Sequence, residues 1–234
     1  MSSLHGEARA RYVRHMFGRI AGRYDLLNRL MTAGQDGRWR AEVVRRLAPT
    51  GDVRVLDLGT GTGDLAFEVQ HRAPGARTVA ADFTPEMIEV GRQRPGGDGV
   101  QWLIADALNL PFGSGTFDGL VSGFLLRNVS DVDRALSEQR RVLKSGGRMV
   151  CLDTNPPPPG LMRPFIEFHL HRIVPWMGRM IAGDAEAYRY LPDSTEGFLA
   201  PEALAHKMRT AGFEGTGYAR RMLKTIAIHW GTAA

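Results

Sequence analysis

The sequence predicts an α/β fold in which a mostly parallel sheet is covered by helices on both faces. Three features lead to this prediction. Short apolar runs alternate with helical patterns from residue 53 onward, a glycine cluster directly follows the first run, and two extended runs close the chain after its last helical segment. Parallel neighbours must be joined by crossover connections, and helices at this spacing between strands supply them.

The composition is typical of a soluble globular chain. Of the 234 residues, 43% are hydrophobic and 24% charged, which excludes an intrinsically disordered protein. The single cysteine, Cys151, excludes an intramolecular disulfide and a cysteine-based zinc cluster, and it fits a reducing compartment. Because no uninterrupted apolar run is long enough, we expect no membrane-spanning helix, and the arginine-rich N-terminus does not resemble a secretory signal.

We expect one domain built in four parts. These are a helical cap (1–50), a core (51–155), a helical lid insertion (156–200), and a closing helix with strands (201–234). The cap carries ten arginines against four acidic residues, whereas the core carries 11 basic and 14 acidic residues. The net charge of +5 therefore comes from the flanks. Their arginines would either form solvated surfaces or contact an anionic surface.

The pattern within the core predicts five strands and three helices. The strands are expected at 53–58, 77–82, 100–105, 117–124 and 149–152. The helices are expected at 64–73, 85–93 and 131–143. Thr84 is placed to cap the second helix, and Val132, Leu136 and Leu143 fall on one face of the third.

The flanks are predicted to be mainly helical. Two helices, broken near Gly34 and Gly37, account for the first 50 residues. A four-proline connector at 156–159 leads to a helix at 161–181 that is interrupted at Pro175. A last helix at 201–212, with proline in its first turn and glycine past its end, precedes closing strands at 213–218 and 222–229.

A glycine loop joins the first strand to the first helix of the core. It reads Asp57-Leu58-Gly59-Thr60-Gly61-Thr62-Gly63-Asp64. Glycines let the backbone approach a ligand closely, and the helix N-terminus offers free N–H groups. A dinucleotide fingerprint would need a third glycine at the position of Asp64, where an acid would repel a pyrophosphate. Acids at both edges of the loop instead favour a positively charged ligand such as S-adenosylmethionine, which has no phosphate.

Acidic residues also end the second and third strands. Asp82 can accept hydrogen bonds from both ribose hydroxyls, and Asp106 can reach an adenine amino group with Ala107 beside the ring. Because parallel strands share one carboxyl edge, these acids and the loop predict one site for S-adenosylmethionine and its demethylated product, S-adenosylhomocysteine. The residues predicted to bind this cofactor are Asp57, Gly59, Thr60, Gly61, Thr62, Gly63, Asp82, Phe83, Asp106, Ala107, Ser122 and Gly123.

Motifs from about Phe17 to Gly231 resemble those of one family. The glycine loop resembles motif I of the class I, Rossmann-like methyltransferases. Five further segments resemble signatures of the ubiquinone/menaquinone biosynthesis C-methyltransferases. These segments are 24–28, 124–129, 141–148, 182–184 and 188–191. The resemblance implies a terminal antiparallel strand and a helical insertion after the fifth strand. It also implies methyl transfer to a ring carbon of a prenylated quinol, either demethylmenaquinol or the corresponding ubiquinone precursor. No metal is expected, because His169 and His171 point to different helix faces and have no acidic cluster beside them.

Three residues are expected to act on the quinol, whose ring carbon is a weak nucleophile until a neighbouring phenol loses its proton. Arg127, just past the fourth strand on the solvent side, would hold the phenolate or orient a water, because arginine is not a base at neutral pH. Asn128 would orient the second hydroxyl, and Tyr24 would relay a proton or close the pocket. The structural alternatives are that Arg127 pairs with Asp131 or Asp153 and that Tyr24 is a buried aromatic.

The chain departs from the family's pattern at several positions. The departures are Thr32 for Ser, Asp36 for His, Leu125 for Gly, Ser145 for Pro, Asp153 for Glu, Asn155 for Ser, and the segment 222–225, which lacks a Thr-x-Gly pattern. Because these positions lie near the expected substrate side, the choice between naphthoquinol and benzoquinol and the length of the tail stay open.

Two other functions are considered. One keeps the cofactor and methylates carbon or oxygen of a soluble, natural-product-like small molecule. The other is a binding module that has lost catalysis, against which the intact glycine loop and Asp82 argue. A nicotinamide oxidoreductase is disfavoured by the missing third glycine.

Residues 156–183 are expected to form the acceptor's entrance and to contact a membrane surface. A prenyl tail costs about 0.8 kcal/mol per exposed CH₂, so the enzyme should take its acceptor from the bilayer. An apolar stripe at helical spacing consists of Met162, Ile166, Leu170, Ile173 and Met177. The alternative is that this stripe packs on the sheet. We therefore expect a cytoplasmic, peripherally membrane-associated protein without a nucleic-acid partner, and a homodimer is left open.

Overall fold

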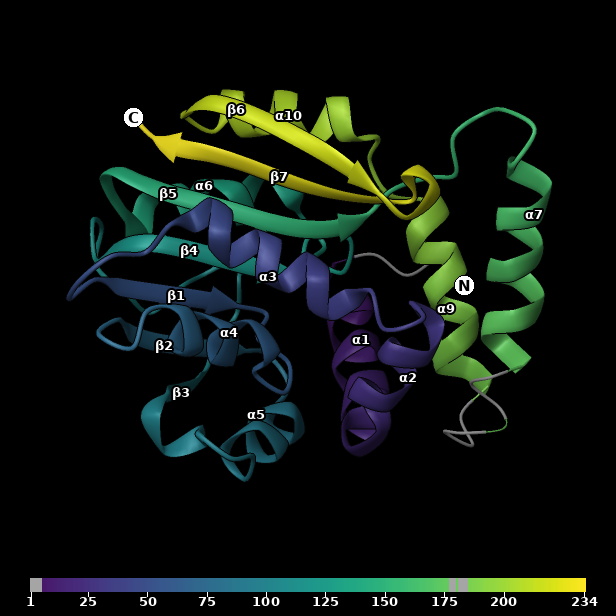
Figure 1. Cartoon of the computed structure of the whole chain (residues 1–234), viewed down its shortest axis with the longest axis horizontal. Helices are drawn as coiled ribbons and strands as arrows, with labels where there is room; N and C mark the ends of the chain where they lie inside the picture. The colour runs from purple at the N-terminus through teal and green to yellow at the C-terminus, as the bar shows by residue number, and fades with distance from the viewer. Residues whose placement is uncertain (1–5, 177–179, 181–184) are drawn as a thin grey trace.

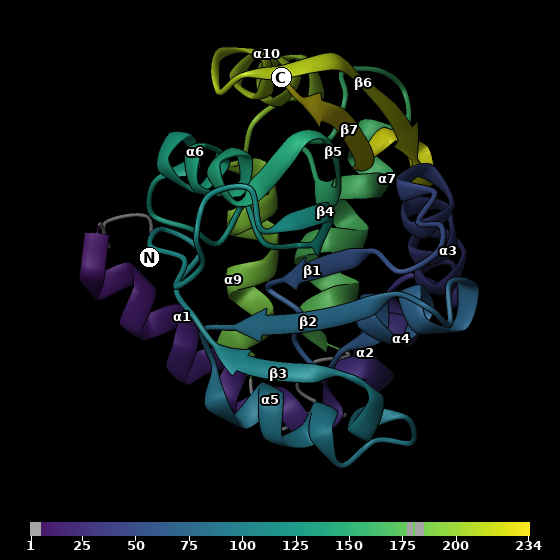
Figure 2. The same cartoon turned by 90° about the vertical axis from the view of Figure 1, so that its left-hand side faces the viewer.

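The sheet of the computed structural model has seven strands in the order β3-β2-β1-β4-β5-β7-β6 (Figure 1). The structure describes residues 6–176, 180 and 185–234. The strands are β1 (Arg54–Leu58), β2 (Arg77–Asp82), β3 (Gln101–Ile104), β4 (Phe117–Gly123), β5 (Leu143–Thr154), β6 (Phe213–Arg221) and β7 (Ile226–Ala233). The five neighbouring strands β3, β2, β1, β4 and β5 all pair in parallel. Strand β7 is antiparallel to both β5 and β6 (Figure 2). The predicted fold class is confirmed.

Helices cover both faces of this sheet. The α-helices are α1 (Gly6–Ile20), α2 (Tyr24–Met31), α3 (Asp36–Leu47), α4 (Asp64–Arg72), α5 (Pro85–Arg92), α6 (Val132–Val142), α7 (Arg163–Phe168), α9 (Ala185–Glu196) and α10 (Pro201–Thr210). Short 3₁₀ turns are η1 (Ala21–Arg23), η2 (Gly97–Gly99) and η4 (Met222–Lys224). One core forms where α3 and α4 pack on the sheet, and a second forms on the face covered by α6 and α10.

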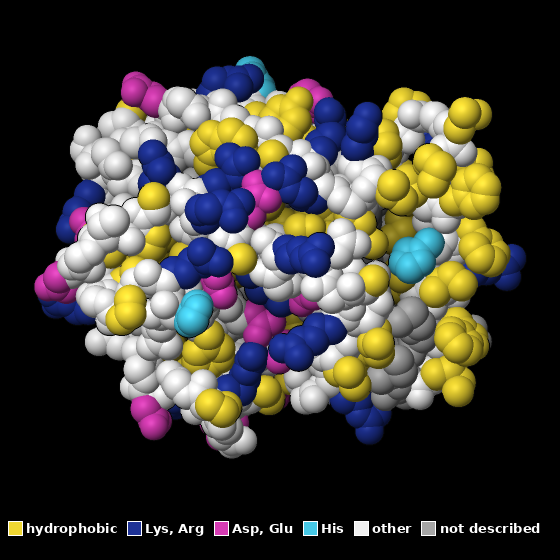
Figure 3. Space-filling view, in the orientation of Figure 1, with side chains coloured by type: hydrophobic (Ala, Val, Ile, Leu, Met, Phe, Trp, Pro, Cys, Tyr) yellow, Lys and Arg dark blue, Asp and Glu magenta, His cyan; other side chains and the backbone are white. Residues whose placement is uncertain are grey.

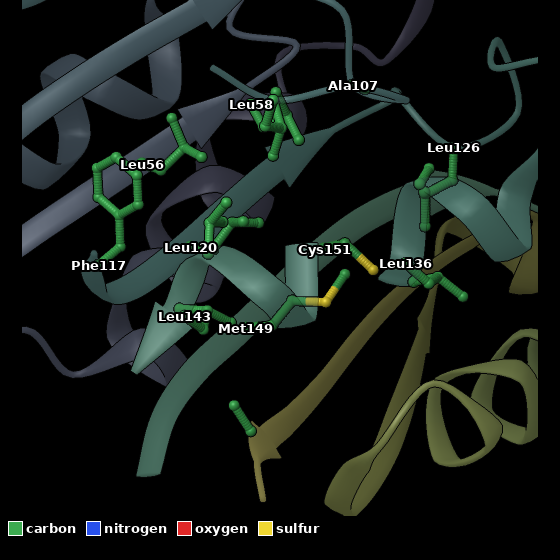
Figure 4. Close-up of a cluster of buried hydrophobic side chains, with 14 of the residues drawn as sticks. Leu56, Leu58, Ala107, Phe117, Leu120, Leu126, Leu136, Leu143, Met149 and Cys151 are labelled. Carbon is green, nitrogen blue, oxygen red and sulfur yellow. The ribbon is translucent and has the colours of Figure 1, made fainter. Parts of the chain in front are cut away.

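Both faces of the central strands are buried. In β1, Val55 belongs to the α3–α4 core and Leu56 to the α6–α10 core, because successive strand residues point to opposite faces. Figure 4 shows the second core, where Leu56 lies beside Phe117 and Met149 lies near Cys151. Strands buried on both sides read as continuous apolar runs, which is why they were recognisable in the sequence. Burial also raises the pKa of the Cys151 thiol, as expected for a small, inert core residue.

The largest differences from the predicted strand boundaries are in β5 and β7. β5 begins at Leu143 rather than at residue 149, because it pairs with β4 and later with β7. β7 begins at Ile226, because Met222, Leu223 and Lys224 form the turn that reverses the chain after β6. These three residues have positive φ angles of 42°, 51° and 68°. Three consecutive non-glycine residues in this region make the turn strained.

The helical flanks also differ in detail. Three helices replace the two expected in the first 50 residues, and Gly37 lies inside α3 rather than at a break. Thr84 precedes α5 but makes no capping hydrogen bond through its side chain, whereas Asp131 caps α6 by accepting from the Arg134 N–H at 2.9 Å.

The helix expected at 161–181 is not broken at Pro175. α7 passes into a π-helical turn, η3 (His169–Ile173), and helical structure continues through residues 174–176. A proline removes one N–H and crowds the carbonyl four residues earlier, and a wider turn ahead of it relieves that conflict. Met177 of the expected apolar stripe and the family-like segment 182–184 lie outside the described part of the chain. Within the described part, no helix is both long enough and apolar enough to cross a bilayer.

Candidate active site

The glycine loop follows β1 and turns directly into α4. Gly59, Gly61 and Gly63 have φ angles of 68°, 56° and 93°, a conformation that residues with a Cβ rarely adopt. At Gly63 a Cβ would also lie 2.5 Å from the Trp102 ring. The turn itself therefore requires these glycines, and it places the loop backbone at the carboxyl edge of the sheet.

Asp57 lies beneath the loop and is fully buried. One of its carboxyl oxygens accepts from the Thr60 hydroxyl at 2.6 Å and from the Ala66 N–H at 2.9 Å. Burial is the main cause that raises the pKa of Asp57 to about 7, and the nearby Asp82 and Asp64 carboxylates add to it. Asp57 thus holds the loop against α4 from behind.

A cavity of about 130 Å³ lies beside the loop, with Asp82 in its wall. The two Asp82 oxygens accept backbone N–H groups from Gly61 and Thr84, each at 2.8 Å. Burial raises the pKa of Asp82, and these hydrogen bonds oppose the rise because they stabilise the carboxylate. Asp106 and Ala107 line the same cavity from the segment that follows β3.

Most of the residues predicted to bind the cofactor share this region. Those that line the 130 Å³ cavity, or the smaller pocket beside it at the loop, are Gly59, Thr60, Gly61, Thr62, Asp82, Phe83, Asp106, Ala107 and Gly123. The other three, Asp57, Gly63 and Ser122, do not line either space. Asp57 and Ser122 are buried in the strands, and Gly63 faces Trp102.

Several wall residues were not predictable from the sequence, because they come from distant parts of the chain. Helix α1 contributes Val13, Arg14 and Phe17, and helix α3 contributes Arg40. The i, i+4 spacing of Val13 and Phe17 shows that α1 has an apolar side, but it does not show what that side covers. Leu125 also lines the larger cavity and packs against Gly59.

A chain of ion pairs joins the N-terminal helices to the loop. Arg40 bridges Asp36 and Asp64 at 2.5 and 2.9 Å, and Arg94 bridges Asp64 and Asp25 at 2.7 and 3.1 Å. Burial is the main cause that raises the pKa of Asp25, and the neighbouring Asp64 charge adds to it. Across the described residues, no three His, Cys, Asp or Glu side chains converge as metal ligands.

Arg127 is buried just after β4, with 5% of its surface exposed. Its guanidinium donates to Asp153 at 3.3 Å and to the Thr154 hydroxyl at 3.2 Å, and it lies 4.9 Å from the centre of the Phe124 ring. Burial raises the pKa of Asp153, and the Arg127 charge opposes that rise. Of the two acids suggested by the sequence as partners of Arg127, Asp153 forms the ion pair, whereas Asp131 caps helix α6.

Tyr24 and Asn128 lie near Arg127 but face the loop side. Tyr24 lines both pockets at the loop, and burial is the main cause that raises its pKa, so its hydroxyl stays protonated at neutral pH. The Asn128 amide donates to the Phe124 carbonyl at 2.8 Å and its oxygen accepts from the Tyr190 hydroxyl at 3.1 Å. Asn128 thus ties α9 to the end of β4.

A second, mainly apolar cavity of about 310 Å³ lies between β5, the β6–β7 turn and the α7 segment. Its apolar walls are formed by Met31, Phe124, Phe165, Ile166, Leu170, Val174, Met222, Leu223 and Ile226. Phe124 lines this cavity and also both pockets at the glycine loop. Its φ of 58° is unusual for a phenylalanine, and the Asn128 hydrogen bond to its carbonyl holds it there.

The profile of the ubiE/COQ5 methyltransferase family matches residues 5–233. The chain belongs to this family. The ubiquinone/menaquinone biosynthesis C-methyltransferase UbiE of Desulfotalea psychrophila is 48% identical over 219 residues, which are 94% of this chain and 89% of that relative. The demethylmenaquinone methyltransferase of Thermus thermophilus is 46% identical over 218 residues, 92% of this chain and 99% of that relative.

Solved structures agree with the fold of this ubiE/COQ5 family member. A possible histamine N-methyltransferase from Thermotoga maritima has a TM-score of 0.66 at 21% identity, over 94% of this chain and 99% of the other. A Haemonchus contortus phosphoethanolamine N-methyltransferase with S-adenosyl-L-methionine has a TM-score of 0.64 at 14% identity, over 83% and 52% of the two chains. At these identities the likeness concerns the fold alone.

The departures of this ubiE/COQ5 family member are compensated in its structure. Asp36 is buried but paired with Arg40, and its backbone N–H donates to the Thr32 hydroxyl oxygen at 3.4 Å. Asp153 neutralises Arg127, and the Asn155 amide donates to the Lys224 carbonyl, which holds the strained turn. These three departing residues therefore have partners within the folded chain.

Proposed function

We propose that this methyltransferase transfers a methyl group to a ring carbon of a prenylated quinol, converting demethylmenaquinol to menaquinol or acting on the corresponding ubiquinone precursor. The observation that carries the proposal is the meeting of two cavities at Phe124. One is framed by acids at the glycine loop, and the other is apolar with a buried arginine in its wall. The names of the relatives, which specify quinone biosynthesis, support the same acceptor.

The cofactor is S-adenosylmethionine, and the residues of the loop cavity fit it. Asp82 lines this cavity and holds the loop through the Gly61 and Thr84 N–H groups, and its carboxylate would also accept hydrogen bonds from the ribose hydroxyls. Asp106 and Ala107 would hold the adenine end, while Asp64 and Arg40 suit the ammonium and carboxylate of the methionine end. When bound, the cofactor supplies a methyl group on a positively charged sulfur.

The proposed role of Arg127 is to favour the phenolate form of the quinol. A buried guanidinium stabilises a negative charge that develops close to it far more strongly than it would in water. Asp153 keeps this arginine oriented through the pair at 3.3 Å. A guanidinium does not act as a base at neutral pH, so the phenolic proton leaves to water or to another group.

Tyr24 and Asn128 are proposed to position the acceptor. The raised pKa of Tyr24 makes its hydroxyl a hydrogen-bond donor at neutral pH, so it would orient a ring oxygen or pass on a proton as part of a chain. Asn128 holds Phe124 through its carbonyl, and Phe124 borders both cavities. Alignment of the acceptor carbon with the transferred methyl group contributes a large part of the rate in such reactions.

We further propose that the protein docks on a membrane surface through an exposed apolar face, here called the apolar lip. It consists of Leu161, Met162, Phe165, Phe168, Trp176, Met180 and Leu223, each at least half exposed. Figure 3 shows hydrophobic side chains gathered over the α7 side of the molecule. The expected stripe is turned differently, because Ile166 is buried and lines the apolar cavity with Leu170. The cavity thus opens beside the apolar lip, as a prenyl tail requires.

Replacing Phe168 and Trp176 with aspartate should abolish association with vesicles of anionic phospholipid. Both side chains are exposed, at 60% and 57%, and neither lines the cavity, so the fold and the acceptor site should be preserved. Sedimentation with vesicles measures binding, and the Michaelis constant for a long-tailed quinol should rise about tenfold while that for a short-tailed analogue stays unchanged. Ile104→Asp, at the far sheet edge, is the matched control. Undiminished vesicle binding by the double variant would contradict the proposed surface.

Purified protein should methylate a chemically reduced demethylmenaquinol but not its oxidised quinone. The oxidised ring is poor in electrons and cannot attack a methyl group. Mass spectrometry of the product, with the demethylated benzoquinol precursor and a soluble naphthol as parallel acceptors, identifies both the acceptor and the methylated atom. Exclusive methylation of a hydroxyl on the soluble compound would replace the quinol proposal with the natural-product alternative.

A further inference from the structure

The apolar cavity contains few polar atoms, and most of them have partners. The Thr32 hydroxyl donates to the Asn28 carbonyl at 2.8 Å, and the Thr225 hydroxyl donates to the Met222 carbonyl at 2.7 Å. The Thr154 hydroxyl accepts from Arg127 at 3.2 Å. The remaining polar residues of the wall are Arg127, His169, which is only half-buried, and Thr195.

Thr195 is different because its buried hydroxyl has no hydrogen-bond partner among the residues that the structure describes. Only 2% of the residue is exposed. A threonine in a helix commonly bonds back to the carbonyl one turn earlier, and Thr195 does not. A buried polar group without a partner costs about 1–3 kcal/mol, so its place in an otherwise apolar wall requires an explanation.

A second buried atom without a partner in the described chain is the Nε of Arg127, another residue of the same wall. The two positions come from different elements, α9 and the segment after β4. A ligand that satisfies both must have a largely apolar body with oxygen atoms at two places. A hydroquinone ring meets this description, since each of its two oxygens can accept or donate a hydrogen bond.

We infer that the Thr195 hydroxyl binds one ring oxygen of the acceptor in the apolar cavity, while the Arg127 guanidinium faces the other. This inference rests on the proposed quinol acceptor. Thr195 would then select an acceptor that carries two ring oxygens over an acceptor that carries only one. A site built to hydrogen-bond an oxygen discriminates against a ligand that lacks it, because the site's own polar group is then left unpaired.

The test compares Thr195→Val, which removes the hydroxyl at nearly constant shape, with Thr195→Ser, which keeps it. The probe is a naphthohydroquinone with one isoprenyl unit, titrated anaerobically into protein saturated with S-adenosylhomocysteine so that no transfer occurs. The valine variant should bind this probe about five- to tenfold more weakly than wild type, and the serine variant within about twofold. Affinity for S-adenosylhomocysteine should be the same in all three proteins.

Two further readouts separate ligand binding from a structural role. The unliganded valine variant should melt at the same temperature as wild type or about 2–4 °C higher, because an unpaired buried hydroxyl has been removed. Two matched naphthols, each lacking one ring oxygen, complete a thermodynamic cycle. The valine effect should persist on one naphthol and vanish on the other, which identifies the oxygen that Thr195 binds.

The possible failures are distinguishable. If wild-type protein methylates the quinol but the valine variant binds the probe as wild type does, the role of Thr195 is overturned and the quinol function stands. A valine variant that melts earlier and weakens all three probes equally would also overturn it, since the hydroxyl would then be structural. If wild-type protein neither binds nor methylates the quinol, the proposed function and this inference fall together.

Discussion

Exchanging Arg127 for glutamine together with Asp153 for asparagine should lower turnover of a reduced quinol by about two orders of magnitude. The buried guanidinium lines the cavity proposed to hold the phenolate, and the removal of one such electrostatic contribution commonly costs this much. The double exchange is preferable to Arg127→Ala. Breaking a buried pair from one side costs about 3–5 kcal/mol because a buried charge stays behind unpaired.

Single-turnover kinetics and calorimetry with S-adenosylmethionine test this expectation. The affinity for the cofactor should change by no more than about threefold, because Arg127 lines the apolar cavity and not the loop cavity. The matched control removes an exposed ion pair in the same way, by Arg77→Gln with Asp52→Asn, and should turn over like wild type. An unchanged single-turnover rate in the Arg127 and Asp153 double variant would contradict the assigned role.

Substituting Asp82 with alanine should weaken S-adenosylmethionine binding by about 1.5–3 kcal/mol, or about 10- to 150-fold in the dissociation constant. The substitution removes the proposed ribose acceptor and also the oxygens that receive the Gly61 and Thr84 N–H groups. Both losses act on the cofactor, since Gly61 belongs to the loop that borders its cavity. Titration calorimetry with the cofactor and with S-adenosylhomocysteine measures the effect.

A graded series makes the Asp82 test sharper. Asp82→Asn retains one acceptor oxygen and should give an intermediate loss of affinity. Asp133→Ala removes a carboxylate of the same size at an exposed ion pair with Lys207 and should leave binding unchanged. Circular dichroism checks that each variant is folded. If Asp82→Ala binds both ligands as wild type does, the proposed ribose contact is incorrect.

The sheet and the loop were predictable because they depend on local properties of the chain. The strand β2 was predicted with its observed limits, Arg77–Asp82, since central parallel strands are apolar on both faces and end in recognisable turns. The glycine loop needs positive φ at three positions, which only glycine adopts readily. Acids at strand ends were brought to one edge by the parallel topology alone, so Asp82 and Asp106 could be assigned to one site.

What the sequence determined by itself is therefore the fold class, the loop and the sheet edge that carries the site, because periodicity and backbone requirements are local. Tertiary packing decided which way the remaining side chains face. Arg127 follows a strand like many exposed arginines, yet it is buried against Asp153, and Ile166 turns into a cavity instead of toward solvent. Thr195 gave no signal in the sequence. Its unpaired hydroxyl has meaning only because α9 is packed over the apolar cavity, and contacts between such distant segments are not encoded in the local pattern.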